Sequence, residues 1–195
     1  MNLSKPAFPH VWVISGPSGV GKGTLIKRLL AQKPQYRLSI SATTRAPRPG
    51  EVNGKDYWFL SEAAFDAAVQ NNDFIEWCPV HQHRYGTLKS EFTPKTPDEI
   101  LILEIDTQGA KKVFSAFDVH SIFIAPPSME ALQHRLQTRN TETPEALNKR
   151  LEAAKNELQD QVFFETSLIN DDLETCLQDL IITIDSCQRP SNSLY

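Results

Sequence analysis

The chain has 195 residues, which is long enough for one domain with a sizeable buried core. Hydrophobic residues make up 40% of it and charged residues 23%, as in ordinary globular proteins. The formal net charge is −4, so the overall charge does not favour binding to nucleic acid or to an anionic membrane. An anionic substrate must therefore be held by local groups of Arg and Lys.

The cysteines and the N-terminus bear on location. Residues 1–10 contain no apolar signal core, and no apolar run is long enough to span a membrane. Cys78, Cys176 and Cys187 are scattered and form no C-x-x-C motif. An odd, scattered set of cysteines indicates reduced thiols, so we expect a cytoplasmic protein without a membrane partner.

The stretch Val11 to Thr24, VWVISGPSGVGKGT, reads as a buried strand, a glycine-rich turn and the start of a helix. Gly16, Gly21 and Lys22 fit the phosphate-loop spacing G-x-x-x-x-G-K. Backbone N–H groups bind phosphate oxygens in such loops, and glycine lets the chain curl around them. The helix N-terminus and the lysine charge add to the attraction. A glycine-rich loop without a nucleotide is the less favoured alternative.

The loop departs from the strict motif at one position. Gly23 follows the lysine where the strict motif has the Ser or Thr that binds Mg²⁺, and the hydroxyl is on Thr24 instead. This G-K-G-T variant resembles that of adenylate kinases. The sequence therefore does not identify the residue that binds the metal directly.

The rest of the chain alternates predicted strands and helices. In chain order we expect a helix that ends before Pro34, strands at 38–40 and 56–60, a helix capped by Ser61, a strand at 74–80, a strand or turn at 84–87 and a strand at 100–106. We then expect a helix from 108, a strand at 121–125, a helix at 129–138 capped by Ser128, a helix at 144–159, a strand at 167–170, and a last helix capped by Asp171 or Asp172. This order predicts an α/β fold, a P-loop NTPase-like parallel sheet with helices on both faces.

Several charged residues suit a phosphate site but have simpler explanations. Arg45 and Arg48 lie in a Pro- and Gly-rich loop, and arginine suits bidentate phosphate binding. Taken alone, a solvated basic loop is the commoner case. Glu76 lies among large apolar residues, and its side chain either faces solvent, the commoner case, or is held for a ligand. Asp106 ends an apolar run, as does the acid that holds Mg²⁺ in phosphate-loop enzymes.

A polar connector at 140–143 lies between two predicted helices and is flanked by arginines. Arg135, Arg139 and Arg150 are either ordinary solvated helix charges or parts of a lid that closes over phosphates.

Several separate stretches together resemble the guanylate kinase family. They run from about Val11 to Leu180 and are GPSGVGKGT, SATTRAPRPGEVNGKDYWF, DFIEW, YGT, EIDTQGA, APPS, RNTETPEALNKRL and NDDL. The second stretch is the most specific of them. The resemblance implies a single domain with a core at 10–35, 98–134 and 160–188, an inserted GMP-binding subdomain at 36–97, a helical lid at 135–159 and a tail at 189–195.

The resemblance also implies an activity, the transfer of the γ-phosphoryl group of ATP to GMP, and also to dGMP, with Mg²⁺ as cofactor, in a monomer or small homo-oligomer. The implied ATP-binding residues are Gly16, Pro17, Ser18, Gly19, Val20, Gly21, Lys22, Gly23, Thr24, Asn170 and Asp171. Asn170 and Asp171 would lie near the ATP base. The implied metal-binding residues are Thr24 and Asp106, the latter also through water.

For GMP, the resemblance implies that the phosphate is held by Arg45, Arg48, Tyr57 and Tyr85. It implies that the guanine edge is read by Ser41, Glu76 and Thr87, that Glu51 supports the arginines, and that Asp106 lies at the GMP site. The implied catalytic residues are Lys22, Arg48, Arg139 and Arg150, with Arg139 and Arg150 bridging the transferring group.

Two departures and two alternatives remain. Glu104 stands where many members have Asp, and FFETSLIND replaces the usual aromatic–Asp–aromatic sequence before Asn170. A guanylate-kinase-like module that binds phosphopeptides without catalysis is one alternative, although such modules tend to lose the phosphate loop and the lid arginines. A kinase for a sugar phosphate is the other, and the guanine-reading positions speak against it.

Overall fold

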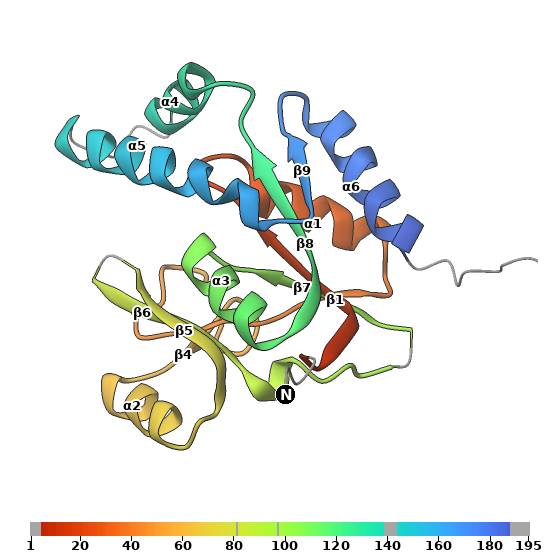
Figure 1. Cartoon of the computed structure of the whole chain (residues 1–195). Helices are drawn as coiled ribbons and strands as arrows, with labels where there is room; N and C mark the ends of the chain where they lie inside the picture. Colours follow the sequence, from red (N-terminus) through yellow and green to blue (C-terminus); the bar gives the residue numbers. More distant parts are fainter. Residues whose placement is uncertain (1–4, 81, 97, 139–143, 188–195) are drawn as a thin grey trace, which may run out of the picture. The chain divides into compact units, whose positions relative to one another are not determined.

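The computed structural model describes residues 5–80, 82–96, 98–138 and 144–187. The chain forms two compact units. The first unit is Met1–Val13 with Gln35–His120, and the second unit is Ile14–Pro34 with Ser121–Tyr195 (Figure 1). The expected division into core, insert and lid is a different one and stays a prediction.

A five-stranded sheet has the strand order β2-β7-β1-β8-β9. Its strands are β1 (Ala7–Ser15), β2 (Tyr36–Leu38), β7 (Ile100–Glu104), β8 (Asp118–Ala125) and β9 (Thr166–Ile169). The pairs β2–β7 and β8–β9 are parallel. Both faces of β1 and β7 are apolar, as expected of strands in a parallel sheet, and residues 11–14 and 100–103 are buried. The predicted α/β fold class is confirmed.

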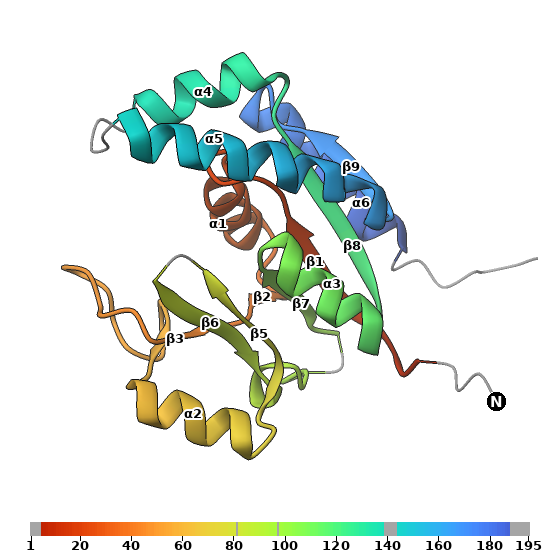
Figure 2. The same cartoon turned by 60° about the vertical axis from the view of Figure 1, so that its left-hand side comes forward.

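The first unit also contains a four-stranded sheet in the order β4-β3-β6-β5. The strands of this sheet are β3 (Ala42–Thr43), β4 (Trp58–Phe59), β5 (Phe74–Val80) and β6 (His83–Leu88). The same unit contains α2 (Glu62–Gln70), the 3₁₀ turn η1 (Lys89–Glu91) and α3 (Thr107–Ala116). Strands β5 and β6 form an antiparallel hairpin, and α2 lies beside this sheet (Figure 2). The buried side chains of Ala42, Phe65 and Phe74 join the helix to the strands.

The second unit carries the helices that surround the phosphate loop. They are α1 (Lys22–Gln32), α4 (Met129–Gln137), α5 (Pro144–Gln159), the 3₁₀ turn η2 (Asp160–Phe163) and α6 (Leu173–Cys187). Helices α4 and α5 lie side by side and share a small core of Leu132, Leu136 and Ala154 (Figures 1 and 2). Within the described ranges, no helix has the length and apolar composition to cross a membrane.

The helix signals in the sequence are confirmed. The bounds of α5 match the predicted 144–159, and Ser61, Ser128 and Asp172 each accept a backbone N–H at a helix start. Residues 84–87 form a strand and not a turn. The connector 140–143, Arg139 and the tail 189–195 lie outside the described residues.

Three strands differ from their predicted bounds, because hydrogen bonds engage the residues at one end of each. The strand predicted at 38–40 ends at Leu38, because the N–H of Ile40 donates to a carboxylate. The strand predicted at 56–60 covers Trp58–Phe59 alone, because Asp56 lies in a turn in which its carboxylate accepts the N–H of Val52. The strand predicted at 100–106 ends at Glu104, because Asp106 caps α3.

The small core of the first unit gives a stability prediction. Phe65 is 0% exposed and stacks on Phe74 with 4.5 Å between ring centroids. Phe65→Ala should lower the free energy of unfolding by about 3–5 kcal/mol, because it leaves a cavity under α2. Urea denaturation measures this loss. Val52→Ala, at a side chain that is 53% exposed, is the control and should change stability by less than about 0.5 kcal/mol. Equal losses in the two variants would contradict the assignment of this core.

Candidate functional site

The turn between β1 and α1 has the geometry of a phosphate loop. Gly21 precedes α1 with φ 102°, and no side chain of the described residues caps the helix start. A helix start without a side-chain cap suits the binding of an anion. Gly16 has φ 143°, and a Cβ there would lie 2.1 Å from the carbonyl oxygen of Ile124. Glycine at this position is a steric requirement of the loop.

Lys22 lies against the loop it follows. Its Nζ donates to the carbonyl oxygens of Gly16, at 2.5 Å, and of Pro17, at 3.1 Å. The ammonium charge is thus held beside the loop backbone, where a lysine of this motif meets phosphate. Thr24 is exposed in the first turn of α1.

Helix α5 contributes two groups to the same loop. Arg150 Nη2 donates to Ser18 Oγ at 2.9 Å, so the structure brings this predicted lid arginine to the loop. The Ser18 N–H donates to Glu157 Oε2 at 3.3 Å. A loop N–H that donates to a carboxylate oxygen is positioned to bind other anionic oxygens.

A pocket of about 330 Å³ adjoins the loop in the second unit. It is lined by Gly19, Val20, Gly21, Thr24, Arg135, Thr138, Asn170, Asp171 and Leu173. Its volume lies within the range of small-molecule sites, about 300–1,000 Å³. The predicted residues Asn170 and Asp171 therefore do lie beside the phosphate loop, at one pocket.

Asn170 and Arg135 hold the wall of this pocket together. The Nδ2 of Asn170 donates to Val20 O at 2.7 Å, and its side chain is buried. Arg135 Nη1 donates to Asn170 O at 2.8 Å and to Val20 O at 3.4 Å, while Nη2 donates to Asp171 O at 3.2 Å. The end of β9 is thereby fastened to the phosphate loop.

In the first unit, Arg45 and Glu51 form a half-buried ion pair. Arg45 Nη2 lies 2.9 Å from Glu51 Oε1, and the backbone N–H of Arg48 donates to Glu51 Oε2 at 2.7 Å. Arg45 lowers the pKa of Glu51 by its hydrogen bond, and Glu51 raises the pKa of Arg45 in the same way. Glu51 thus contacts both the side chain of Arg45 and the backbone of Arg48 in the loop that carries these arginines.

Two tyrosines lie at this arginine. The guanidinium carbon of Arg45 lies 5.2 Å from the Tyr57 ring centroid, and the rings of Tyr57 and Tyr85 meet edge to face at 6.0 Å. Burial raises the pKa of Tyr57, with a smaller contribution from Tyr85. The Tyr57 hydroxyl is therefore a neutral donor at physiological pH. A fixed arginine with two phenol donors suits a phosphate group.

Glu76 is buried and does not face solvent. A bulge between Phe74 and Glu76 places Glu76 on the face of β5 that carries Cys78, opposite to Phe74, and Glu76 is 5% exposed. Thr87 Oγ1 donates to Glu76 Oε1 at 2.8 Å. Burial raises the pKa of Glu76 to about 7, although the bond from Thr87 opposes the shift. A carboxylate with so few internal donors is suited to accept hydrogen bonds from a ligand.

Asp106 lies next to this group at the start of α3. Its Oδ1 accepts the N–H of Gly109 at 2.7 Å, and its Oδ2 accepts the thiol of Cys78 at 3.4 Å. Burial raises the pKa of Cys78 to about 12, so the thiol keeps its proton and remains a donor. A Cβ at Gly109 would lie 2.8 Å from Glu76 Oε2, so a larger residue there would displace the Glu76 carboxylate.

The two sets of predicted residues divide between the two units. The predicted GMP-binding residues, from Ser41 to Asp106, belong to the first unit, and the described ATP-binding residues belong to the second. Ser41, between β2 and β3, accepts the N–H of Trp58 with its carbonyl at 2.9 Å. Glu104 ends β7.

The residues predicted for Mg²⁺ fit a cation that is held mainly by other ligands. Across the described ranges, no group of three or more His, Cys, Asp or Glu side chains forms a metal cage. Mg²⁺ commonly keeps several waters and is bound by one or two protein groups and by substrate phosphates. Thr24 belongs to the second unit and Asp106 to the first, so their joint role in binding Mg²⁺ stays a prediction.

Sequence reasoning missed the roles of Arg135, Glu157 and Cys78. Arg135 was considered only as a helix charge or lid residue, yet it ties two loops by their carbonyls. Nothing in the sequence pattern marks Glu157 or Cys78, because each acts through a partner far along the chain.

Comparisons with known proteins agree with this geometry. A sequence model described as guanylate kinase matches residues 9–186. A guanylate kinase of Streptomyces kasugaensis is 43% identical over 177 residues, covering 90% of this chain and 86% of that protein. One of Caldanaerobacter subterraneus subsp. tengcongensis is 45% identical over 185 residues, covering 92% and 89%. The crystal structure of guanylate kinase from Anaplasma phagocytophilum has a TM-score of 0.75 at 28% identity, covering 96% of this chain and 90% of that one. The chain belongs to the guanylate kinase family.

Proposed function

We propose that the protein transfers the γ-phosphoryl group of ATP to GMP, giving ADP and GDP. The observation that carries the proposal is the buried carboxylate of Glu76, in the same unit as an arginine and tyrosine cluster. Guanine offers N1–H and an exocyclic amino group side by side, and one carboxylate accepts both. The same contacts accommodate dGMP, because they involve base and phosphate.

Each unit has the groups for one nucleotide. In the second unit, the phosphate loop and Lys22 would bind the ATP phosphates, and the pocket at Asn170 and Asp171 would take the base. In the first unit, Arg45, Arg48, Tyr57 and Tyr85 would hold the GMP phosphate, with Ser41, Glu76 and Thr87 at the guanine. We also propose that residues 36–97 act as the GMP-binding insert and residues 135–159 as the lid.

Phosphoryl transfer depends on positioning and on neutralising charge rather than on covalent chemistry with the protein. Lys22 and Arg150 are the described cations at the loop that would stabilise the negative charge spread over the transferring group. Arg48 and Arg139 complete the proposed catalytic set. Mg²⁺, held by Thr24 and Asp106 partly through water, would neutralise charge on the phosphates.

The non-catalytic alternative has less support. A phosphopeptide-binding module has no use for a phosphate loop, whereas this chain has the loop, Lys22 against it, and Arg150 on its serine. The relatives that cover most of its length are named guanylate kinase. We place the activity in purine nucleotide metabolism and in the cytoplasm, where three unpaired thiols are stable. A monomer or small homo-oligomer stays a prediction.

A coupled assay of ADP release tests the proposal on the unmodified protein. We expect rapid ADP release with GMP and dGMP, slow release with IMP, and little with AMP or ribose phosphates. A chain that used a ribose phosphate as well as GMP would instead be a kinase of another substrate class.

Lys22→Ala should lower kcat by at least about 100-fold in a folded protein, because a full charge next to the transferring group is lost. Lys27→Ala, an exposed lysine on the same helix, is the matched control and should keep its activity. Steady-state kinetics with ATP and GMP measure both. Near-normal turnover in Lys22→Ala would refute the role given to the loop.

Glu76→Gln should reduce kcat/KM for GMP by about 10- to 100-fold, because an amide has one acceptor where the base needs two, and an unsatisfied buried donor is costly. The ratio of GMP to IMP should fall as well, since IMP lacks the amino group. Kinetics with GMP, IMP and AMP in both proteins provide the measurement. Unchanged ratios would mean that another residue reads the base.

The raised pKa of Glu76 predicts a pH dependence. Below a pKa of about 7 the carboxyl is protonated and has lost an acceptor, so affinity for GMP should rise with pH. From pH 6 to 8 the gain should be about tenfold, the change in ionised fraction. The GMP phosphate also titrates near pH 6, and Glu76→Gln corrects for it because that variant retains only the phosphate titration. Superimposable profiles for the two proteins would contradict this assignment.

A further inference from the structure

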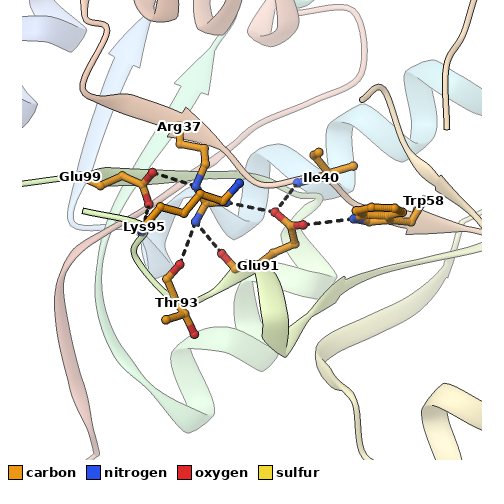
Figure 3. Close-up of polar contacts among 7 residues, drawn as sticks. All are labelled: Arg37, Ile40, Trp58, Glu91, Thr93, Lys95 and Glu99. Atoms are coloured by element: carbon orange, nitrogen blue, oxygen red, sulfur yellow. Dashed lines mark hydrogen bonds and ion pairs between the residues drawn. The ribbon is translucent and has the colours of Figure 1, made fainter. Parts of the chain in front are cut away.

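The first unit contains a buried ion cluster that includes none of the predicted site residues. It consists of Arg37 at β2, Glu91 in η1 and Glu99 before β7, with Trp58 of β4 beside them (Figure 3). Glu91 is 8% exposed and Glu99 is 7% exposed. Buried carboxylates are costly unless they are paired and hydrogen-bonded, so the arrangement of their partners is strongly constrained.

Arg37 joins the strand that enters the smaller sheet to the segment that leaves it. Its Nη1 donates to Glu91 Oε2 at 3.0 Å, and its Nη2 donates to the carbonyls of Glu91 at 2.9 Å and Thr93 at 3.0 Å. Its Nε donates to Glu99 Oε1 at 3.0 Å, and Glu99 Oε2 accepts the N–H of Lys95 at 2.9 Å. Arg37 therefore fixes β2 and the segment from Glu91 to Glu99 relative to each other.

The carboxylate of Glu91 reaches two further segments. Its Oε2 also accepts the backbone N–H of Ile40 at 3.3 Å, and its Oε1 accepts the indole Nε1–H of Trp58 at 3.1 Å. Figure 3 shows Glu91 between Arg37 and Ile40 on one side and Trp58 on the other. Both oxygens are thus committed, each to a different part of the chain.

The two residues held by Glu91 are direct chain neighbours of proposed GMP ligands. Ile40 precedes Ser41, and Trp58 follows Tyr57. The backbone N–H of Trp58 donates to the carbonyl oxygen of Ser41 at 2.9 Å, so the segments at Ser41 and Tyr57 are joined to one another. A shift of the Glu91 carboxylate would therefore move the backbone of both Ser41 and Tyr57.

We propose that Glu91 is a positioning residue for GMP, and that it fixes the base-reading segment at Ser41 through Ile40 and the phosphate-binding segment at Tyr57 through Trp58. The proposal rests on the proposed function. Glu91 itself touches neither Ser41 nor Tyr57, so its effect is on where those residues lie. Because its contacts lie wholly in the first unit, they bear on GMP and not on ATP.

Glutamine cannot replace Glu91 without a conflict. An amide has one acceptor oxygen, and its NH₂ group would meet a donor on the other side, either the Trp58 indole or the Ile40 N–H with Arg37. Trp58→Phe is a milder change, because it removes the indole donor but leaves the ion pairs and an aromatic ring.

The experiment compares Glu91→Gln and Trp58→Phe with Glu62→Gln, which removes an exposed carboxylate paired with Arg84 in the same unit. We expect KM for GMP to rise about tenfold in Glu91→Gln and about three- to tenfold in Trp58→Phe, as for the loss of one or two hydrogen bonds. KM for ATP and kcat should change by less than about twofold, and Glu62→Gln should resemble the wild type. Calorimetric titration of each protein with GMP alone, well below its melting temperature, checks the binding without turnover.

Other results overturn the inference. An unchanged KM for GMP in a folded Trp58→Phe protein would do so, and so would equal changes in KM for ATP and GMP, which would indicate a general loss of structure. If Glu91→Gln does not fold, Trp58→Phe decides the matter alone. A wild-type protein that does not phosphorylate GMP would refute the proposed function, and the inference with it. Normal wild-type activity with unaffected variants would refute the inference alone.

Discussion

The cost of removing a carboxylate from water must be offset by ion pairs or hydrogen bonds. The structure depends on which partners each of its buried carboxylates has. Glu91 and Glu99 share the guanidinium of Arg37, and their remaining oxygens accept N–H groups of the chain. Glu76 has only Thr87 as a hydrogen-bond partner among the described residues, and its pKa is raised to about 7. The first two carboxylates are therefore compensated within the fold, while the third is the one that we propose to bind guanine.

The anion site that we propose in the second unit depends on backbone groups rather than on buried charge. Gly16 and Gly21 allow the loop to curl, and the start of α1 supplies N–H groups. Asn170 and Arg135 hold the loop by its carbonyl at Val20, so the curl is maintained by side chains from the end of β9 and from α4. A preorganised loop of this kind needs little rearrangement when phosphate binds.

Much of this could be predicted from the sequence where the signal is local. Glycine spacing identified the phosphate loop, and Ser61, Ser128 and Asp172 begin helices because each side chain bonds a backbone N–H three residues on. A family resemblance, carried by specific strings, is the source of the proposed GMP residues, which stay a prediction.

What could not be predicted depends on residues that are distant in sequence. Arg37 meets Glu91 and Glu99 at sequence separations of 54 and 62 residues, and no periodic pattern marks such pairs. The early end of the strand at Leu38 has the same cause, since the N–H of Ile40 is taken by Glu91. The burial of Glu76 was an open question, because strand alternation does not say which face of a hairpin is covered.

The most direct test of the account is the pKa of Glu76, measured by carbon-13 NMR of its side-chain carboxyl. The resonance can be assigned by its loss in Glu76→Gln. We expect a pKa of about 7 in the protein alone and a value well below that with saturating GMP, because the base stabilises the charged form. A value near the ordinary 4.3 in the protein alone, or a pKa that GMP leaves unchanged, would contradict the claim that this carboxylate is kept for guanine.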